Sequence, residues 1–596
     1  MASRIEDYAL LGDCQSAALV GPTGSIDWLC LPRFDSDACF AALLGTEENG
    51  FWKIAPRSPI RNVRRAYRDG TLTLETELTT DEGTISIIDF MAVGEATADV
   101  VRIVIGKTGE VPVHMELALR AGYGTTVPWV RAIPGGIEAV TGPDLFRLTT
   151  AVPIRGEGLR TVADFVVRAG EQVAFVFDWS PSHLVPPPPV DAVAALERCE
   201  AFWAEWSSRA KIDGPYAAIV KRSLLTLKAL TYAPTGGIVA APTTSLPEEI
   251  GGVRNWDYRF CWVRDATFTL YALLSAGYTD EARAWRDWLL RAAAGAPSQL
   301  QILYGIAGER RLVEVELPWL EGYEGSKPVR IGNKASEQVQ LDVFGELMDT
   351  LYLCSESGLA PSEAGWALQR ALVTHLETAW LETDCGIWEV RGPQRHFTHS
   401  KVMCWVAFDR GVKTIEKFGM KGPLDRWRAA RAAVHADICA NGFDAAQNSF
   451  VQHYGSTLLD ASLLMMPLVG FLPPSDPRMI GTVNAVERTL VREGLVQRYL
   501  PDARVDGLPG GEGAFLPCSF WLADALVLLG RIDDARALFE RLVGLSNDLG
   551  LLSEECEPTS RRMLGNFPQA LSHVALVNTA LNLSRAEGPA LHRRKI

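Results

Sequence analysis

Hydrophobic and polar residues alternate along roughly the first third of the chain. Within 71–78, leucine or threonine occupies every second position, and a turn at 81–83 leads into the apolar run 85–90. A period of two predicts β-strands, and several such strand and turn units follow one another with little helical periodicity between them. The pattern therefore predicts an antiparallel β-sandwich domain over residues 1–185.

A change of pattern separates this region from the rest of the chain. Four consecutive prolines at 186–189 end the strand pattern, and apolar residues at helical spacing follow over 191–210. The sequence thus predicts a linker with one helix over 186–214 and a second domain, expected to be catalytic, over 215–596.

From residue 215 onward the apolar positions recur about every 3.6 residues, which is typical of amphipathic helices. Twelve such helices would make six helical hairpins, which fit a closed ring, although a helical solenoid would give a similar count. The predicted fold class is therefore multidomain β + α, an N-terminal antiparallel β-sandwich followed by an (α/α)6 barrel. The predicted helices lie near 216–233, 265–277, 279–293, 337–357, 362–380, 399–418, 424–440, 457–470, 477–492, 518–529, 532–545 and 569–585.

Composition and charge narrow the function classes. The 596 residues are 47% hydrophobic and 22% charged, as expected for a folded chain with two large domains. The net charge of −14 comes without a basic stripe, which argues against a nucleic-acid partner. Segment 1–7 lacks an apolar signal core, and no stretch approaches the roughly 20 apolar residues that span a bilayer. We therefore expect a cytoplasmic protein with no membrane partner.

The 11 cysteines are scattered, with no Cys-x-x-Cys pair and no Cys/His cluster at zinc spacing, so reduced thiols and no metal are expected. Candidate chemistry is concentrated instead in long loops rich in tryptophan, glycine, proline and carboxylates, because such loops on a rigid scaffold commonly carry function. These loops are 235–264, 304–336, 381–398, 493–517 and 547–568.

The first of these loops ends in a segment, 255–265, that is dense in aromatic and charged side chains. Sugar sites use this mixture, because aromatic faces cover the C–H face of a pyranose while Arg and Asp bond its hydroxyls. Trp256, Arg264 and Asp265 are therefore candidate sugar ligands. A compatible alternative is that Asp265 caps the following helix and Arg264 is its surface neighbour.

The loop 381–398 places Glu389 between Trp388 and Val390. Apolar surroundings raise a carboxyl pKa, and a general acid has to hold its proton at the working pH, so Glu389 is the candidate acid. The alternative is an ordinary loop ion pair with Arg391.

The last long loop carries Glu554 within an acidic run, Glu554-Glu555-Cys556-Glu557. Neighbouring carboxylates can orient a water, so Glu554 is the candidate general base, with a solvated acidic turn as the alternative. Glu512, in a glycine-rich segment, is a third candidate acid.

Four short motifs occur in a characteristic order: Trp-x-Arg-Asp at 262–265, Trp388-Glu389, Arg498-Tyr499 and Ser553-Glu554. This order resembles glycoside hydrolase family 15, the glucoamylase and bacterial trehalase family. The resemblance extends from about Asp7 to Leu583. Longer stretches that resemble its prokaryotic branch are 24–30, 241–247, 386–392 and 564–570.

The resemblance implies the same succession of β-sandwich and (α/α)6 barrel, with Glu389 as general acid and Glu554 as general base. The chain departs from fungal glucoamylases at Val390, where they have a second acidic residue, so their preference for maltose-like leaving sugars is not implied. The residues implied to hold the non-reducing glucose are Arg264, Asp265 and Arg498, with Trp388 as a wall of the subsite.

The implied activity is that of an inverting, exo-acting α-glucoside hydrolase that releases glucose from the non-reducing end without metal or cofactor. Its expected substrate is a small α-glucoside or oligosaccharide, either trehalose or an α-1,4 or α-1,6 gluco-oligosaccharide. The residues at 389–392 and 570–573 place trehalose slightly ahead. An inverting disaccharide phosphorylase and a non-catalytic carbohydrate-binding protein on the same fold are the alternatives. The acidic run at 553–555 favours hydrolysis, because it would repel phosphate.

The subsite for the leaving sugar is expected from loop 304–336, including Trp319 and Lys334, and from the N-terminal segment near Arg33 and Asp35. Two further residues complete the predicted substrate-binding set, Arg391 and His573.

Overall fold

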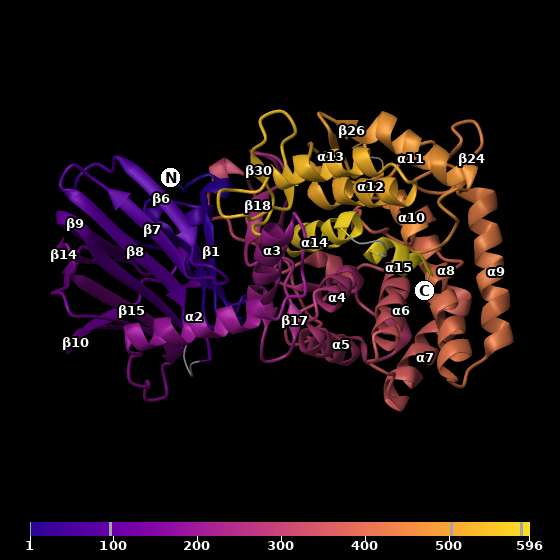
Figure 1. The fold of residues 1–596 in the computed structure, drawn as a ribbon. Helices are drawn as coiled ribbons and strands as arrows, with labels where there is room; N and C mark the ends of the chain where they lie inside the picture. The colour runs from indigo at the N-terminus through magenta and orange to yellow at the C-terminus, as the bar shows by residue number, and fades with distance from the viewer. Residues whose placement is uncertain (1, 95–97, 501–504, 585–587, 596) are drawn as a thin grey trace.

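The computed structural model describes residues 2–94, 98–500, 505–584 and 588–595. A domain of β-sheet and a larger domain of helices lie side by side, joined by helix α2 (Ala192–Ser208), which runs beneath the β-sheet domain towards the helical domain in Figure 1.

The N-terminal domain is built on one long strand, β9 (Ala98–Ala118), that passes from one layer of sheet into the other. The first half of β9 pairs with β8 and β15, and its second half pairs with β5 and β14, all antiparallel. The two layers enclose a core of apolar side chains, and the predicted β-sandwich is confirmed. The strands are β1 (Ala9–Gly12), β2 (Ala17–Val20), β3 (Ser25–Cys30), β4 (Ala38–Phe40), β5 (Phe51–Pro56), β6 (Asn62–Tyr67), β7 (Leu74–Thr79), β8 (Gly83–Met91), β9, β10 (Trp129–Ile133), β11 (Gly136–Thr141), β12 (Asp144–Thr150), β13 (Arg155–Glu157), β14 (Arg160–Arg168) and β15 (Gln172–Pro181).

A buried arginine fastens the two layers of the sandwich to each other. Arg102, on the first half of β9, pairs with Asp89 on β8 at 2.8 Å. The same guanidinium donates to the carbonyls of Trp52 and Gly24 in the opposite layer, each at 2.9 Å. Every one of these bonds is buried, so the charge is compensated where water cannot reach it.

The helical domain is a closed double ring. Each inner helix contacts the next, and α14 contacts α4, so the ring closes and the solenoid alternative is excluded. Within the described residues, the inner helices are α4 (Ala266–Ser275), α6 (Asp342–Glu356), α8 (Thr398–Phe418), α10 (Met465–Leu468), α12 (Leu516–Leu528) and α14 (Ala570–Ser584). The outer helices are α3 (Ala217–Ala229), α5 (Thr279–Ala293), α7 (Glu363–Ala379), α9 (Leu424–Asn441), α11 (Pro477–Leu490) and α13 (Ile532–Val543). The predicted (α/α)6 barrel is confirmed.

One inner helix is much shorter than its sequence pattern indicates. The helix predicted near 457–470 consists of a 3-10 turn, Ala461–Leu464, followed by α10. Asp460 is extended and bridges to Tyr499, and its carboxylate accepts from the indole of Trp388. Trp388 lines the pocket described below. The first residues of the helix predicted near 457–470 are therefore not helical where they meet this pocket.

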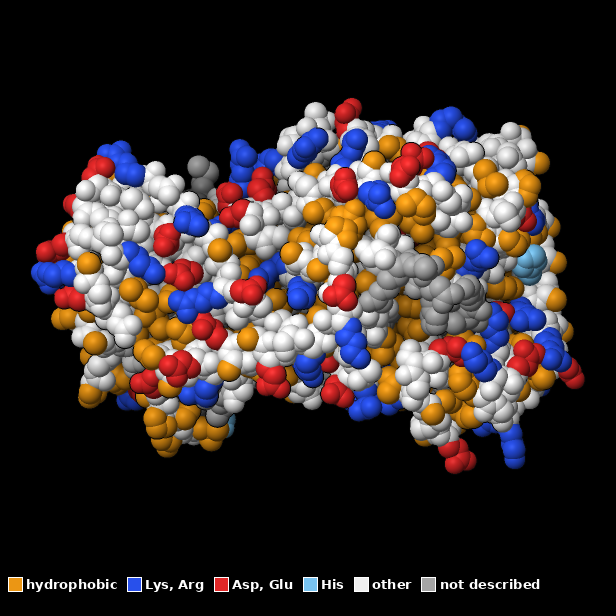
Figure 2. Space-filling view, viewed as in Figure 1, with side chains coloured by type: hydrophobic (Ala, Val, Ile, Leu, Met, Phe, Trp, Pro, Cys, Tyr) orange, Lys and Arg blue, Asp and Glu red, His pale blue; other side chains and the backbone are white. Residues whose placement is uncertain are grey.

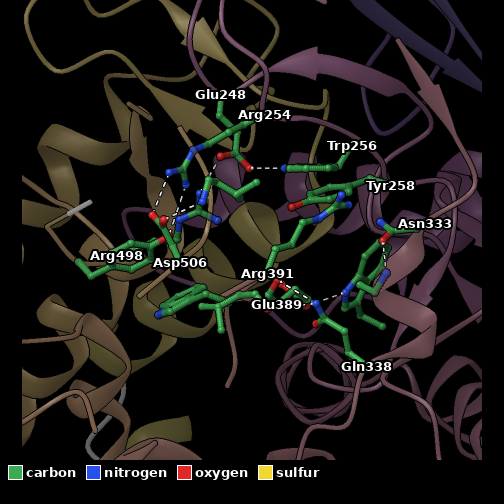
Figure 3. A pocket seen from close by; sticks show the side chains of 16 residues that line it. Glu248, Arg254, Trp256, Tyr258, Asn333, Gln338, Glu389, Arg391, Arg498 and Asp506 are labelled. Atoms are coloured by element: carbon green, nitrogen blue, oxygen red, sulfur yellow. Dashed lines mark hydrogen bonds and ion pairs between the residues drawn. The ribbon is translucent and has the colours of Figure 1, made fainter. Parts of the chain in front are cut away.

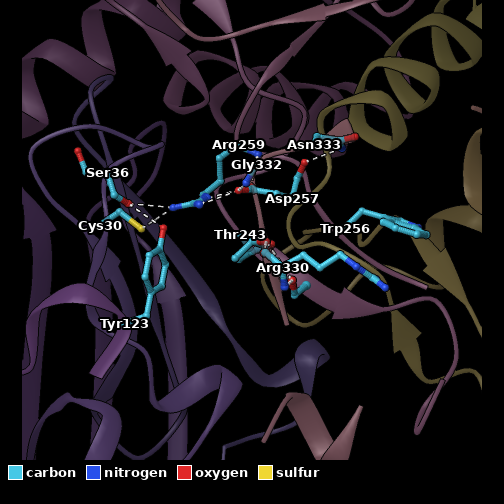
Figure 4. Close-up of polar contacts among 12 residues, drawn as sticks. Cys30, Ser36, Tyr123, Thr243, Trp256, Asp257, Arg259, Arg330, Gly332 and Asn333 are labelled. Carbon is cyan, nitrogen blue, oxygen red and sulfur yellow. Dashed lines mark hydrogen bonds and ion pairs between the residues drawn. The ribbon is translucent and has the colours of Figure 1, made fainter. Parts of the chain in front are cut away.

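The sandwich supports the pocket end of the barrel through buried polar contacts (Figure 4). Arg259 pairs with Asp257 at 2.7 Å and also donates to the carbonyl of Ser36 in the sandwich at 2.9 Å. Asp257 in turn accepts from the backbone of Gly332 at 3.0 Å, beside the pocket residue Asn333. The loops of the pocket are therefore tied directly to the N-terminal domain.

The surface seen in Figure 2 mixes acidic and basic side chains over both domains. In the part of the chain that the structure describes, we find no helix whose length and apolarity would let it cross a bilayer.

Candidate active site

Four of the five long loops contribute residues to one pocket (Figure 3), and each of these loops leads along the chain into an inner helix. The open space is about 550 Å³, including solvent at the mouth, which is within the usual range for small-molecule sites. Its lining mixes aromatic and charged side chains, as sugar recognition requires. The lining residues are Glu248, Arg254, Trp256, Tyr258, Trp262, Asn333, Ala335, Gln338, Trp388, Glu389, Val390, Arg391, Arg498, Tyr499, Asp506 and Leu508.

Glu389 presents its carboxyl to this pocket, with the side chain 22% exposed. Its Oε1 accepts from the indole Nε1 of Trp262 at 3.1 Å and from Nη1 of Arg264 at 3.2 Å. Burial raises the pKa of the Glu389 carboxyl, and the Arg264 charge and the Trp262 hydrogen bond oppose this increase only in part. The group is thereby favoured to keep its proton, as an acid catalyst requires.

Arg264 and Asp265 form a buried pair beside this carboxyl. Nε of Arg264 lies 2.8 Å from Oδ1 of Asp265, and both residues are less than 10% exposed. Asp265 precedes α4 but makes no capping hydrogen bond with its side chain, and Arg264 is not on the surface. The alternative is therefore right only about the position of Asp265, which is the N-cap residue of α4, because its carboxylate pairs with Arg264 instead of capping the helix.

Glu554 lies behind the pocket wall, 1% exposed, on the loop that precedes a short ribbon strand, β29 (Glu555–Cys556). Its Oε2 accepts from the amide of Asn566 at 2.9 Å. A Cβ at Gly565 would lie only 2.5 Å from this oxygen, so the glycine makes room for the carboxylate. Burial, followed by the charge of Glu248, raises the pKa of Glu554 to about 7, although Tyr258 and the Asn566 amide favour the ionised form.

Three buried carboxylates, those of Glu248, Glu554 and Glu555, have oxygen atoms within 4.8 Å of one another. Arg498 supplies the positive charge beside them, with Nη2 2.9 Å from Glu248 and 3.2 Å from Glu555. Because the run at 554–555 is buried, the interpretation as a solvated acidic turn is wrong. The three carboxylates are also close enough to bind one cation together. Arg498 already supplies a positive charge that compensates them.

Glu512, the third candidate acid, is occupied by two arginines. Its Oε2 lies 2.8 Å from Arg254 and 2.8 Å from Arg498, and it is not among the lining residues. It therefore orients the arginines of this wall.

Two tryptophans contribute to the aromatic lining of the pocket. Trp388 donates to Asp460 at 3.0 Å and has Arg498 over its ring at 5.6 Å. Trp256 donates to Glu248 at 3.1 Å and has Arg391 over its ring at 4.3 Å.

Arg391 pairs with a carboxylate, but not with that of Glu389. Its Nη2 lies 2.8 Å from Glu314, so the alternative of a loop ion pair between Glu389 and Arg391 is wrong. Glu389 is held by Arg264 instead.

Five predicted sugar ligands are not among the lining residues. Arg264 and Asp265 still adjoin the pocket through the contact of Arg264 with Glu389, whereas the other three have different surroundings. Trp319, 47% exposed, donates its indole N–H to the carbonyl of Tyr123 in the sandwich. Lys334 is exposed between two residues that do line the pocket. His573 is fully buried, where its Nε2 accepts from the amide of Leu552 at 3.1 Å.

Residues that the sequence did not single out complete the site, notably Glu248, Tyr258 and Gln338. Glu248 immediately follows the stretch 241–247, and Tyr258 lies within the aromatic segment 255–265, so each had a local signal. Gln338 lies at the start of a predicted helix and had none.

Comparison with known proteins agrees with this geometry. Residues 214–581 match the family model described as glycosyl hydrolases family 15, and residues 1–178 match the one described as trehalase-like, N-terminal. The trehalases of Mycolicibacterium smegmatis and Mycobacterium tuberculosis are 39% and 40% identical, over 98% of this chain and 92% and 90% of their own. A trehalase of Thermoplasma volcanium is 34% identical over 98% of this chain and 94% of its own.

Solved structures show how widely the fold is shared. A bacterial glucoamylase complexed with acarbose superposes with a TM-score of 0.73 at 12% identity, covering 98% of this chain and 94% of that one. A putative kojibiose phosphorylase superposes with a TM-score of 0.54 at 10% identity, covering 97% and 86%. The fold alone thus does not separate hydrolysis from phosphorolysis, whereas the match in sequence does assign the family. The chain belongs to glycosyl hydrolase family 15.

Proposed function

We propose that this enzyme hydrolyses trehalose with inversion, with Glu389 as general acid and Glu554 as general base. The observation that carries the proposal is the placement of Glu389 in a sugar-sized pocket whose other wall holds the buried carboxylates around Glu554. The likeness to three proteins named trehalase supports trehalose over longer glucans.

On the acid side, Glu389 donates its proton to the glycosidic oxygen as the bond from that oxygen to C1 breaks. Its raised pKa keeps the proton available. Arg264 and Trp262 both donate hydrogen bonds to Oε1 and so fix the orientation of the carboxyl group. After the step the carboxylate is ionised beside the Arg264 cation, which stabilises the new charge.

On the base side, Glu554 accepts a proton from the water that forms the new bond to C1. Tyr258 and the Asn566 amide stabilise its ionised form, which is the form that a base needs. Water attacks the face opposite the leaving sugar, so the scheme inverts the anomeric carbon. Solvent then restores both carboxyl groups to their starting protonation states.

The remaining polar groups hold the non-reducing glucose. Arg264, Asp265 and Arg498 are candidate partners for its hydroxyls, and Trp388 provides an apolar wall. Because these groups are fixed by buried ion pairs, binding energy is converted into alignment of C1 between acid and base.

Phosphorolysis fits this site poorly. Phosphate would have to approach the buried carboxyl groups of Glu248, Glu554 and Glu555, and each of these groups that is ionised repels it where water is excluded. A non-catalytic sugar-binding role would leave the raised pKa of Glu389 without a purpose.

The test is glucose release from trehalose, maltose, isomaltose, kojibiose and dextran, with the anomer of the first product followed by NMR. We expect trehalose to be cleaved fastest, with one of its two glucose units appearing as the β anomer. Release of the α anomer alone would refute the inverting scheme. Glucose 1-phosphate in phosphate buffer would establish phosphorolysis instead.

A further inference from the structure

The backbone of the proposed acid is held in an unusual conformation by one neighbouring side chain. We propose that Gln338 is a positioning residue that keeps Glu389 in a left-handed backbone conformation and so aims its carboxyl at the glycosidic oxygen. The inference rests on the proposed function, because it takes Glu389 as the acid.

Glu389 has a φ of +49°, in the region that residues with a side chain rarely adopt. Such a conformation costs of order 1–3 kcal/mol and persists only where the surroundings impose it. Its own amide makes a long bond, 3.3 Å, to the carbonyl of Gly386. A stronger constraint comes from Gln338, whose Nε2 donates to the carbonyls of Glu389 and Val390, each at 3.2 Å.

The orientation of the Gln338 amide follows from these two acceptors. Both are backbone carbonyls, which cannot donate, so the nitrogen of the amide and not its oxygen has to face them. The two N–H groups of the Gln338 amide thus bind the carbonyls of Glu389 and Val390, which belong to the two peptide units that follow Glu389. Rotation of either peptide unit would break one of these hydrogen bonds.

Gln338 is itself anchored to the scaffold. The next residue, Val339, accepts from the amide of Cys385 at 3.0 Å, and the amide of Leu341 donates to Asp384 at 2.9 Å. Helix α6 of the inner ring begins directly afterwards, at Asp342. The segment 338–341 therefore connects the acid loop to the barrel, and Gln338 is the point where that connection reaches Glu389 (Figure 3).

The consequence is specific to proton donation. Oε1 of Glu389 is aligned by Trp262 and Arg264, and a shift of its backbone would move the carboxyl away from both. Displacements of about 1 Å can cost on the order of a hundredfold in rate. The proposed sugar ligands Arg264, Asp265 and Arg498 make no hydrogen bond with Gln338 in the described structure.

Two substrates separate this role from a direct contact between Gln338 and the sugar. Trehalose needs a proton on its leaving oxygen, whereas α-D-glucosyl fluoride does not, because fluoride leaves unaided by an acid. For Gln338→Ala we expect kcat on trehalose to fall about 10- to 100-fold and kcat on the fluoride to fall less than about threefold. Gln394→Ala is the matched control, since Gln394 lies in the same loop, where its amide contacts the Cys385 sulfur and the Thr383 hydroxyl and not the backbone of Glu389.

Gln338→Glu keeps the shape of the side chain but sets a carboxylate against the two carbonyls, so the same selective loss is expected if the alanine variant folds poorly. Thermal melting and circular dichroism accompany every variant. An equal loss on both substrates, or no loss on either, overturns the inference.

Glu389→Gln, assayed in parallel, tests the proposed function separately. Suppose that Glu389→Gln loses trehalose hydrolysis but keeps the fluoride reaction, and that Gln338→Ala shows no such selective loss. Only the inference then fails. If Glu389→Gln cleaves trehalose normally, the assignment of the acid fails, and the inference fails with it.

Discussion

Nη1 of Arg264 lies 3.2 Å from Oε1 of Glu389, so a permanent cation touches the carboxyl that we assign as the acid. Burial raises the pKa of this carboxyl while Arg264 lowers it, and burial is the larger effect. The arrangement holds the proton before the reaction and stabilises the carboxylate after it.

Glu389→Gln is expected to lower turnover on trehalose by about 10²- to 10⁴-fold, the usual contribution of general acid catalysis. The amide oxygen of glutamine can still accept from Trp262 and Arg264, so the melting temperature should change little. The measurement is kcat for glucose release, together with thermal unfolding. Near-normal turnover would show that the proton comes from another group.

Glu248→Gln is expected to move the acidic limb of the kcat/KM profile to lower pH. Glu554 has to be ionised to act as base, and the charge of Glu248 is, after burial, the next cause that raises its pKa to about 7. Removal of the Glu248 charge lowers the pKa of Glu554. It also leaves the positive charge of Arg498 less compensated, and this charge lowers the pKa of Glu554 further. The profile between pH 4 and 9 provides the measurement, and an unmoved limb would contradict the assignment of Glu554.

Sequence patterns predicted the architecture well, because helix periodicity and strand alternation are local properties. The predicted helices that begin near 279, 424 and 477 match α5 (Thr279–Ala293), α9 (Leu424–Asn441) and α11 (Pro477–Leu490). The exception near 457–470 arises because Asp460 is held extended by Trp388, a partner distant in sequence.

The site was only partly accessible to the same reasoning. Glu389 could be chosen from its immediate neighbours, but the approach of Glu248 to Glu554 joins loops at opposite ends of the barrel sequence. Trp319 has the composition of a sugar ligand, yet its indole is used on Tyr123 of the other domain. Contacts between segments far apart in the chain leave no trace in spacing or composition.

Arg391→Ala is expected to raise KM for trehalose several-fold with a smaller change in kcat. The guanidinium lies over Trp256 at 4.3 Å and forms part of the pocket wall, but it makes no bond to Glu389 within the described structure. Loss of such a wall weakens binding in the ground state and the transition state alike.

Glu314→Gln provides the control for Arg391. It removes the ion pair at 2.8 Å while leaving the arginine over Trp256, so its effect on KM should be smaller. A larger effect of Glu314→Gln than of Arg391→Ala would place the sugar contact on Glu314.

His573→Ala is expected to destabilise the fold while KM stays near its original value. His573 bridges Ser223, at 3.0 Å from Nδ1, and the backbone amide of Leu552, which lies two residues before Glu554 in the same loop. Because Nε2 accepts, the ring is neutral with its proton on Nδ1. Truncation leaves a buried amide without an acceptor, which costs roughly 1–3 kcal/mol in addition to the cavity.

The pH dependence of stability provides the decisive measurement for His573. Burial lowers the pKa of His573 to about 3, far below its unfolded value of about 6.5. A group with a lowered pKa in the folded state contributes stability that is complete above the unfolded pKa and is lost as pH falls towards the folded pKa. The difference in unfolding free energy between the original protein and His573→Ala should therefore be largest above pH 7 and shrink towards pH 4. If this difference in unfolding free energy is independent of pH and KM rises strongly, His573 would instead be a sugar ligand.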